Sequence, residues 1–436
     1  MKPLLIQNGR IIDPGQGIDM TGNLLIAEGK ISWLGKEPPA QAEYAILNTK
    51  GLIVCPGLID LHCHLRQPGD EEKETIATGT RAAARGGFTT VCCMPNTNPP
   101  LDNQTAIEFI KSKAAAEGAV RVLPIGCISK GRKGEELCEM GELASGGVIG
   151  FSDDGAPVAS AYLMRQALDY SRAFDLPIID HCEEKTLTEG GQMNEGAIST
   201  KLGLRGIPAA AEEIAVARDL ALAELTGGRL HIAHVSTGGS VELIRRAKEK
   251  GIKVTAEVTP HHLTLTEERV LGYDTNTKVN PPLRTREDIK ALIQGLNDNT
   301  IDIIATDHAP HTEADKLCEF DLAPFGISGL ETALGSLMGL VHEGEIKLAT
   351  LIARLTHEPA KIIGDSYGKL GTLAVGAPAD ITIFDPNLEW VVNTNDFASK
   401  GKNTPLAGER FRGRVMATIY GGKLVYQDSS IKIKES

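Results

Sequence analysis

The sequence predicts an α/β protein, a TIM (β/α)8 barrel with a small β-sandwich module built from both chain ends. Three observations lead to this architecture. Strand-like and helix-like segments alternate through the middle of the chain, strand-like runs with tight turns fill both ends, and polar residues gather where the middle strands stop. The length of 436 residues accommodates one large barrel and a small second module.

The two ends of the chain, residues 1–55 and 366–436, have the character of short β-strands separated by turns. Apolar runs in the N-terminal end are broken by turn signals such as Glu28-Gly29-Lys30, and the C-terminal end has a matching signal at Gly421-Gly422. Glycine-containing turns between apolar runs are typical of hairpins. Because each end is too short to build a good core alone, we expect the two to combine in one β module.

Residues 56–365 alternate between strand-like and helix-like segments. Helical segments rich in Ala, Leu, Glu and Lys separate most of the strand-like runs, and glycine often follows a helix. This alternation indicates a (β/α)8 catalytic barrel. A doubly wound open sheet is the alternative, but it would more often carry a glycine-rich fingerprint, and the sequence has neither GxGxxG nor GxxxxGKS/T. The eight strand-like runs are 52–60, 88–93, 120–127, 148–151, 177–180, 230–235, 254–258 and 301–305.

Composition narrows the classes of function and the compartment. With 45 basic and 57 acidic residues the formal net charge is −12, which disfavours binding to nucleic acid or to an anionic membrane surface. No apolar stretch reaches about 18 residues, so no transmembrane helix is expected. The N-terminus lacks a secretory signal, and the eight cysteines form no CxxC pair. We therefore expect buried, reduced thiols in a cytoplasmic enzyme that acts on a small molecule.

Histidine and carboxylate side chains gather at the ends of the expected barrel strands. Of 11 histidines, seven lie in these short windows. Catalytic groups of a (β/α)8 barrel come from the C-terminal ends of its strands, so residues far apart in sequence would meet at one face. The windows are 60–66, 94–97, 152–155, 180–183, 231–236 and 306–311.

His62 and His64 stand two residues apart on an extended segment, so both imidazoles point to one side and can reach one cation. Taken alone, an HxH pair can equally be two half-buried, hydrogen-bonded histidines, and a single polar residue at a strand end is usually a loop cap. Together, the strand-end residues predict a site for zinc, manganese or another divalent ion with nitrogen and oxygen ligands. The expected ligands are His62, His64, Asp154, His181, His234 and Asp307.

The same strand ends carry a resemblance that spans essentially the whole chain. The sequence resembles the metal-dependent amidohydrolases and, within them, the bacterial type I dihydroorotases. The HxH pair marks only the superfamily, whereas the longer motifs are much narrower. These motifs are Asp60-Leu61-His62-Cys63-His64-Leu65-Arg66-Gln67-Pro68-Gly69, Met94-Pro95-Asn96-Thr97, Phe151-Ser152-Asp153-Asp154-Gly155 and Ala305-Thr306-Asp307-His308-Ala309-Pro310-His311.

The resemblance implies one or two zinc ions per subunit, with two favoured. His62, His64 and Asp307 would hold one ion, and His181 and His234 would hold the other. A carboxylate would bridge the two ions.

In many relatives the bridge is a carboxylated lysine at the end of the fourth strand. Here that strand end has Asp153-Asp154 and no lysine, which is the type I pattern. Asp154 fits the bridging position better, and Asp153 stays the alternative. Asp307 would be the catalytic residue that takes a proton from water and hands it to the leaving nitrogen.

The implied reaction is the reversible cyclisation of N-carbamoyl-L-aspartate to L-dihydroorotate in pyrimidine biosynthesis. Arg66 would grip the substrate carboxylate in a fork, and Asn96 and His311 would share it. Asn280 would read the amide edges of the ring, and the long irregular stretch 310–326 suggests a lid over the site. The expected substrate-binding residues are His64, Leu65, Arg66, Asn96, Asn280, His311, Phe325 and Gly326.

Two alternatives stay open. The chain could be a hydantoinase or allantoinase type of cyclic amidohydrolase, although Arg66 and the missing bridging lysine argue against this. It could also be an inactive homologue that serves as a scaffold for aspartate transcarbamoylase, although every proposed metal ligand is present. The resemblance further implies a homodimer and a possible complex with aspartate transcarbamoylase.

Overall fold

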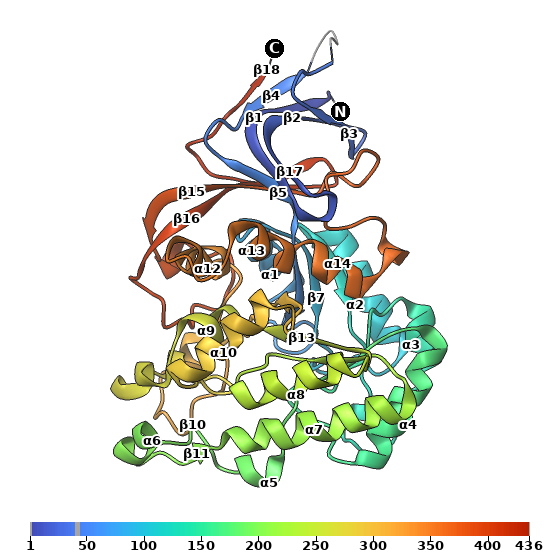
Figure 1. The fold of residues 1–436 in the computed structure, drawn as a ribbon, viewed down its shortest axis with the longest axis vertical. Helices are drawn as coiled ribbons and strands as arrows, with labels where there is room; N and C mark the ends of the chain where they lie inside the picture. Colours follow the sequence, from blue (N-terminus) through green and yellow to red (C-terminus); the bar gives the residue numbers. More distant parts are fainter. Residues whose placement is uncertain (1, 40–43, 436) are drawn as a thin grey trace.

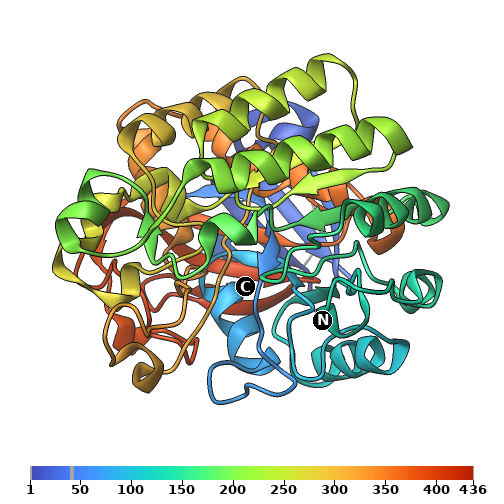
Figure 2. The same ribbon diagram turned by 90° about the horizontal axis from the view of Figure 1, so that it is seen from below.

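The computed structural model describes residues 2–39 and 44–435. Strands from both ends of the chain lie together in the upper part of Figure 1, and the middle of the chain fills the lower part with strands and helices. Seen from below, the long helices lie around the outside of the lower part (Figure 2). Within these described ranges, no helix has the length and apolar character that a membrane crossing requires.

One branched nine-stranded sheet joins the two ends of the chain. The antiparallel pairing of β15 with β5 links the C-terminal strands to the N-terminal ones, and aliphatic side chains from both ends fill the core beside the sheet. A sandwich arrangement of these strands stays a prediction. The main path is β17 (Lys423–Gln427), β16 (Arg410–Tyr420), β15 (Ile381–Val391), β5 (Ile53–Pro56), β1 (Leu4–Asp13), β2 (Ile18–Ala27) and β3 (Lys30–Gly35), with β4 (Ala45–Asn48) beside β1 and β18 (Ile433–Glu435) beside β4.

Both hairpin turns expected from the sequence are confirmed. Glu28 and Gly29 connect β2 to β3 with φ values of 53° and 75°, and Gly421 and Gly422 connect β16 to β17 with φ values of 54° and 77°. Positive φ at both central residues is the geometry of the two-residue turn whose twist matches that of paired strands. Glycine adopts it without steric cost.

In the middle of the chain, parallel pairings join the strands in sequence order, and the segment after the last strand pairs with the first strand. Two sheets account for most of them, and isolated parallel bridges join Gly126 to Phe151, Phe151 to Ile178 and Cys63 to His308. We call this arrangement the strand ring. One sheet contains β6 (Leu58–Cys63), β7 (Phe88–Cys93) and β8 (Arg121–Pro124), and the other contains β9 (Ile178–Asp180), β12 (Leu230–Ile232), β13 (Val254–Val258) and β14 (Ile303–Ile304).

The sequence predicts a strand over 148–151 at the fourth position of the strand ring, but the structure has no full strand there. Only Phe151 makes β-bridges there, one to each neighbour. A Cβ atom at Gly150 would lie 3.0 Å from the Ile179 side chain and 3.1 Å from the Pro177 carbonyl oxygen, so the backbone passes close to the next strand. Asp153 and Asp154 follow this short contact.

Helices surround the strand ring. Thr75, Asn103, Ser160, Thr237 and Thr285 cap five of the long helices, each accepting a hydrogen bond from the backbone N–H three residues ahead. The main helices are α1 (Ile76–Arg85), α2 (Gln104–Glu117), α3 (Met140–Gly146), α4 (Ala161–Ser171), α7 (Ala209–Thr226), α8 (Gly238–Glu249), α10 (Arg286–Asn297), α12 (Ala333–His342), α13 (Leu348–Leu355) and α14 (His357–Ile363). Shorter elements are α5 (Lys185–Thr188), β10 (Met193–Asn194), α6 (Ala197–Leu202), β11 (Gly206–Ile207), α9 (Pro260–Thr264) and α11 (Glu313–Lys316).

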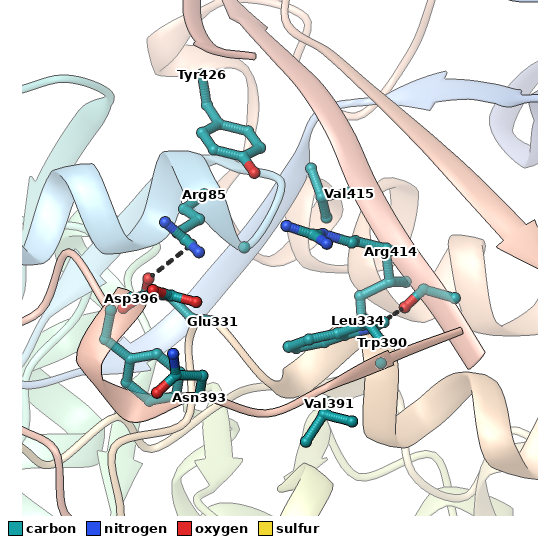
Figure 3. A pocket seen from close by; sticks show the side chains of 14 residues that line it. Arg85, Glu331, Leu334, Trp390, Val391, Asn393, Asp396, Arg414, Val415 and Tyr426 are labelled. Carbon is teal, nitrogen blue, oxygen red and sulfur yellow. Dashed lines mark hydrogen bonds and ion pairs between the residues drawn. The ribbon is translucent and has the colours of Figure 1, made fainter. Parts of the chain in front are cut away.

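A pocket marks the junction between the helices around the ring and the β module. Figure 3 shows Arg85 from the end of α1 beside Glu331, with Trp390 of β15 and Arg414 of β16 across the space. Arg85 Nε lies 3.3 Å from Glu331 Oε1, and Trp390 Nε1 donates to the Gly413 carbonyl oxygen over 2.8 Å. Each of these two contacts lies within one part of the chain. Glu331 links the parts, because its carboxylate also accepts hydrogen bonds from the backbone N–H groups of Ala398 and Ser399 over 2.9 Å and 3.2 Å.

Candidate metal centre

The strand ends bring together all six side chains that the sequence singled out as metal ligands. His62 belongs to β6, and the others follow the C-terminal ends of strands or the Phe151 bridge. Every one of them is buried. The six are His62, His64, Asp154, His181, His234 and Asp307, and none exposes more than 6% of its surface.

Asp307 lies against the HxH pair. Its Oδ1 atom is 3.0 Å from His64 Nε2 and 3.5 Å from His62 Nε2. The ligating atoms of these three residues all lie within 4.8 Å of one another, so a single cation could contact all three.

Asp154 faces the other side of the cluster. Its Oδ1 atom lies 3.5 Å from His62 Nε2, 3.7 Å from His181 Nδ1 and 3.8 Å from His234 Nε2. His181 Nδ1 and His234 Nε2 are 2.8 Å apart. Asp154 therefore stands between the two groups of histidines.

Asp153 turns away from the cluster. Its Oδ1 atom accepts hydrogen bonds from the backbone N–H groups of Ile128 and Ser129 over 2.9 Å and 3.1 Å, and its Oδ2 accepts one from the Ser129 hydroxyl. These bonds hold the loop after β8. Of the two neighbouring aspartates, only Asp154 reaches the histidines.

The charges within the cluster attract one another strongly. Burial alone would lower the pKa of His62, but Glu257, Asp307 and Asp154 outweigh it and raise this pKa to about 10. Burial would raise the pKa of Asp307, yet the adjacent His62 and His64 hold it below its ordinary value. The pKa of Asp154 is lowered in the same way against burial, most of all by His62. Two ionised carboxylates in a buried site call for positive charge beside them.

The donor set fits a divalent cation. His62 Nε2 is buried and makes no hydrogen bond within the described part of the chain, although two carboxylate oxygens lie 3.5 Å away. Imidazole nitrogens with carboxylate oxygens are the usual ligands of zinc, and a catalytic zinc keeps one position free. Two overlapping three-residue groups share His62, one with His64 and Asp307 and one with Asp154 and His234.

Glu257 is a buried partner of the cluster that the sequence reasoning missed. It lies in β13, and its Oε1 atom accepts a hydrogen bond from His62 Nδ1 over 2.6 Å. His231 contacts the other oxygen of Glu257 over 3.1 Å. A glutamate in the otherwise apolar and small run Val254–Val258 was the signal that could have identified it.

Asn96 contacts two of the candidate ligands. Its Oδ1 atom accepts a hydrogen bond from His64 Nδ1 over 2.9 Å, and its Nδ2 donates to Asp154 Oδ2 over 3.2 Å. Arg66, two residues after His64, has a φ of 60°, and its Nε donates a hydrogen bond to the Pro310 carbonyl oxygen over 3.2 Å. Both residues thus lie at the rim of the cluster, Asn96 beside the ligands and Arg66 beside the start of the 310–326 stretch.

Asn280 contacts a candidate ligand, whereas His311 contacts the 310–326 stretch. Asn280 Nδ2 donates to Glu183 Oε1 over 3.3 Å and is 3.4 Å from His181 Nε2. His311 Nε2 donates to the Phe325 carbonyl oxygen over 2.8 Å. Burial, reinforced by the Arg66 charge, lowers the pKa of His311 to about 3, so its ring is neutral.

The remaining expected substrate-binding residues can offer mainly their backbones. The Leu65 side chain is 2% exposed and belongs to the hydrophobic core. Gly326 has a φ of 143°, and a Cβ atom there would lie 2.8 Å from the Ala309 carbonyl oxygen and 2.9 Å from His311 Nε2. The chain therefore needs glycine at position 326 to pass beside His311.

Three residues that the sequence reasoning overlooked hold the 310–326 stretch in place. Lys278 Nζ donates to the Phe320 and Asp321 carbonyl oxygens, and Lys316 Nζ donates to the Thr275 and Pro324 carbonyl oxygens. Asn403 Nδ2 bridges the carbonyl oxygens of Ala309 and Gly326, both over 3.0 Å. These buried bonds fix a segment that contains a single helical turn, α11.

Comparisons with known proteins agree with this arrangement. The "Dihydro-orotase-like" family model matches residues 51–240, and the "Amidohydrolase family" model matches residues 204–426. Dihydroorotase from Thermoanaerobacter sp. (strain X514) is 55% identical over 425 residues, which is 97% of each chain. Dihydroorotase from Pelotomaculum thermopropionicum is 55% identical over 431 residues, 98% of this chain and 100% of the relative.

Solved structures of similar fold cover almost the whole chain. The L-hydantoinase (dihydropyrimidinase) of Arthrobacter aurescens superposes with a TM-score of 0.88 at 25% identity, over 100% of this chain and 98% of the other. Dihydropyrimidinase from Brevibacillus agri NCHU1002 superposes with a TM-score of 0.86 at 23% identity, over 99% of this chain and 96% of the other. The fold is thus that of cyclic amide hydrolases.

Proposed function

Because the chain belongs to the dihydroorotase family of the amidohydrolases, we propose that it catalyses the reversible cyclisation of N-carbamoyl-L-aspartate to L-dihydroorotate in pyrimidine biosynthesis. The observation that carries this proposal is the buried cluster of four histidines and two aspartates at one end of the strand ring. An inactive scaffold would have no need of six converging polar side chains.

We propose that the cluster holds one or two zinc ions, with two favoured. His62, His64 and Asp307 would hold one ion, His181 and His234 the other, and Asp154 would lie between them. Bound zinc would polarise the amide carbonyl and lower the pKa of a water molecule. The position of Asp154 between both histidine groups supports a bridging role, and the bonds of Asp153 to the loop after β8 argue against it.

Asp307 would move the proton. Its low pKa leaves the carboxylate ionised at neutral pH, so it can accept a proton from the attacking water. It would then pass this proton to the ring nitrogen that leaves when the amide opens. In the direction of synthesis the same residue takes the proton from the carbamoyl nitrogen. His64 Nε2 lies 3.0 Å from Asp307 Oδ1, so the two donor atoms could bind the same ion.

Arg66 would select for the substrate carboxylate. Arg66 Nε donates its hydrogen bond to Pro310, which leaves the two Nη groups to donate to both oxygens of a substrate carboxylate. Asn96, beside His64, and the neutral ring of His311 would complete this anion site, and Asn280 would bind the ring amide on the His181 side. His64, Leu65, Phe325 and Gly326 would line the remaining walls.

We propose the same architecture that the sequence predicts. The closed order of parallel pairings supports a (β/α)8 barrel over residues 56–365, and the shared sheet supports a β-sandwich module made of residues 1–55 and 366–436. β5 ends at Pro56 in the shared sheet and β6 begins at Leu58 in the strand ring, which agrees with a boundary at this point.

We also propose that the chain works in the cytoplasm as a homodimer and can associate with aspartate transcarbamoylase. Eight free thiols, seven of them buried, support a reducing compartment. The apolar side chains of Leu317 and Leu322 are 75% and 70% exposed and support a partner surface near the 310–326 stretch. Light scattering with and without the transcarbamoylase tests both associations.

A paired-substrate assay tests the proposed reaction against the hydantoinase alternative. L-dihydroorotate and 5,6-dihydrouracil share the ring amide, and only the first carries a carboxylate. We expect the purified chain with zinc to open L-dihydroorotate much faster than dihydrouracil or hydantoin. Preference for the uncharged rings would favour the hydantoinase type, and no turnover of any ring by folded, zinc-loaded protein would favour the scaffold.

A further inference from the structure

Glu257 occupies an unusual place in the molecule. It lies inside β13, has no exposed surface, and its neighbours along the strand are small or apolar. Burial of a carboxylate is costly unless its oxygens are paired. Both oxygens are paired here, and the partners come from two other strands of the ring.

The contacts of Glu257 reach both groups of candidate ligands. Oε1 accepts a hydrogen bond from the His62 ring over 2.6 Å and another from the backbone N–H of His234 over 3.2 Å. Oε2 lies 3.1 Å from His231 Nε2, and His231 Nδ1 lies 2.8 Å from Thr255 Oγ1. One carboxylate thus connects β6, β12 and β13 directly beneath the cluster.

These contacts fix the chemistry of the His62 ring. A carboxylate can only accept, so when the neutral His62 ring binds a cation its proton belongs on Nδ1 and its lone pair on Nε2. Nε2 is the atom that faces Asp154 and Asp307, each at 3.5 Å. A ligating histidine whose other nitrogen donates to a carboxylate is held in one tautomer and one orientation.

We propose that Glu257 is a positioning residue that couples the two halves of the metal centre. It sets the tautomer of His62 in one half and the backbone position of His234 in the other, and His231 holds Glu257 in place. The inference rests on the proposed function only in requiring that the cluster binds a divalent cation.

The test compares Glu257→Gln with Glu331→Gln. Glutamine has nearly the same shape but only one acceptor oxygen, so it cannot accept from His62, His234 and His231 together. Glu331 is a second buried acid, located at the junction pocket of Figure 3, and serves as the matched control. The readouts are the affinity of each metal-free protein for zinc, measured by competition with a chromogenic chelator, and the split between kcat and KM for L-dihydroorotate.

We expect Glu257→Gln to weaken zinc binding about 10- to 100-fold, to lower kcat and to leave KM nearly unchanged. Glu331→Gln should bind zinc as the unmodified protein does. A folded Glu257→Gln protein with unchanged zinc affinity and unchanged kcat would overturn the inference. If zinc affinity falls as expected but the unmodified protein does not open L-dihydroorotate, the proposed function fails and the role of Glu257 stands.

A measurement on the unmodified chain covers the case in which Glu257→Gln does not fold. Nitrogen-15 NMR of the histidine-labelled protein reports which ring nitrogen of His62 carries the proton. In the zinc-loaded protein we expect the proton on Nδ1 and the lone pair on Nε2. A proton on Nε2 with an unprotonated Nδ1 in the zinc-loaded protein would overturn the proposed role.

Discussion

Asp154 Oδ1 lies 3.5 Å from His62 Nε2, although His62 belongs to the first position of the strand ring and Asp154 follows the fourth. The same oxygen is within 3.8 Å of His181 and His234. This position distinguishes Asp154 from its neighbour Asp153, whose carboxylate caps the loop after β8.

Replacing Asp154 should change the metal content, whereas replacing Asp153 should change stability. We expect Asp154→Asn to reduce the zinc content from two ions per chain towards one and to cut turnover strongly, because amide nitrogen cannot bridge two cations. Atomic absorption on dialysed protein measures this. Asp153→Asn should keep its zinc and lose about 1–3 kcal/mol of stability, because it leaves buried N–H groups poorly paired. The opposite pattern would assign the bridge to Asp153.

Replacing Arg66 with Met should affect substrate binding more than the chemical step. The loss of charged hydrogen bonds to the substrate carboxylate should raise KM for L-dihydroorotate about 10- to 100-fold. Turnover of dihydrouracil, which lacks the carboxylate, should hardly change. Steady-state kinetics on both substrates checks this, and an unaltered KM for L-dihydroorotate would refute the role of Arg66.

Gly326→Ala should disturb the 310–326 stretch. The added Cβ atom would lie 2.8 Å from the Ala309 carbonyl oxygen and 2.9 Å from His311 Nε2, in a backbone conformation with φ of 143°. We expect a loss of about 2 kcal/mol of stability with weaker substrate binding. Gly344→Ala is the matched control, because its φ is 81° and nothing in the described structure lies within 4 Å of the added atom. Equal effects of the two changes in chemical denaturation would argue against a tight approach at Gly326.

Glu331 should make stability depend on pH. Burial raises its pKa to about 7, although the Ala398 and Ser399 N–H groups and Arg85 oppose the shift. The folded state therefore holds a proton that the unfolded chain releases near pH 4.5. The contribution of the protonated Glu331 to the free energy of unfolding is fully present below pH 4.5. It is lost as the pH rises to about 7, and the loss amounts to as much as about 3 kcal/mol. Chemical denaturation at several pH values should show the unmodified chain losing stability relative to Glu331→Gln across this range. A difference in free energy of unfolding between the two proteins that stays the same at every pH would contradict the assignment.

Much of the centre could be predicted because strand-end residues of a parallel ring must meet at one face. The alternation of His62 and His64 and the strand-end placement of His181, His234 and Asp307 follow from this rule. The rule does not apply after a single bridging residue such as Phe151, so alternation could not decide between Asp153 and Asp154.

Other features depend on contacts between residues far apart in the sequence. Asn403 comes from the C-terminal end of the chain, yet it binds the carbonyl oxygens on both sides of the 310–326 stretch. Glu257 and Lys278 likewise act through partners in other elements. No local pattern specifies such partners, so the three-dimensional structure was needed to identify these contacts.

The most direct measurement is turnover of L-dihydroorotate by the purified chain before metal removal, after chelation and after zinc is restored. We expect hydrolysis that disappears with the chelator and returns with zinc, because the cluster of four histidines and two aspartates would bind the ion that activates water. Turnover that persists in protein shown to be free of metal would contradict the central role of this cluster.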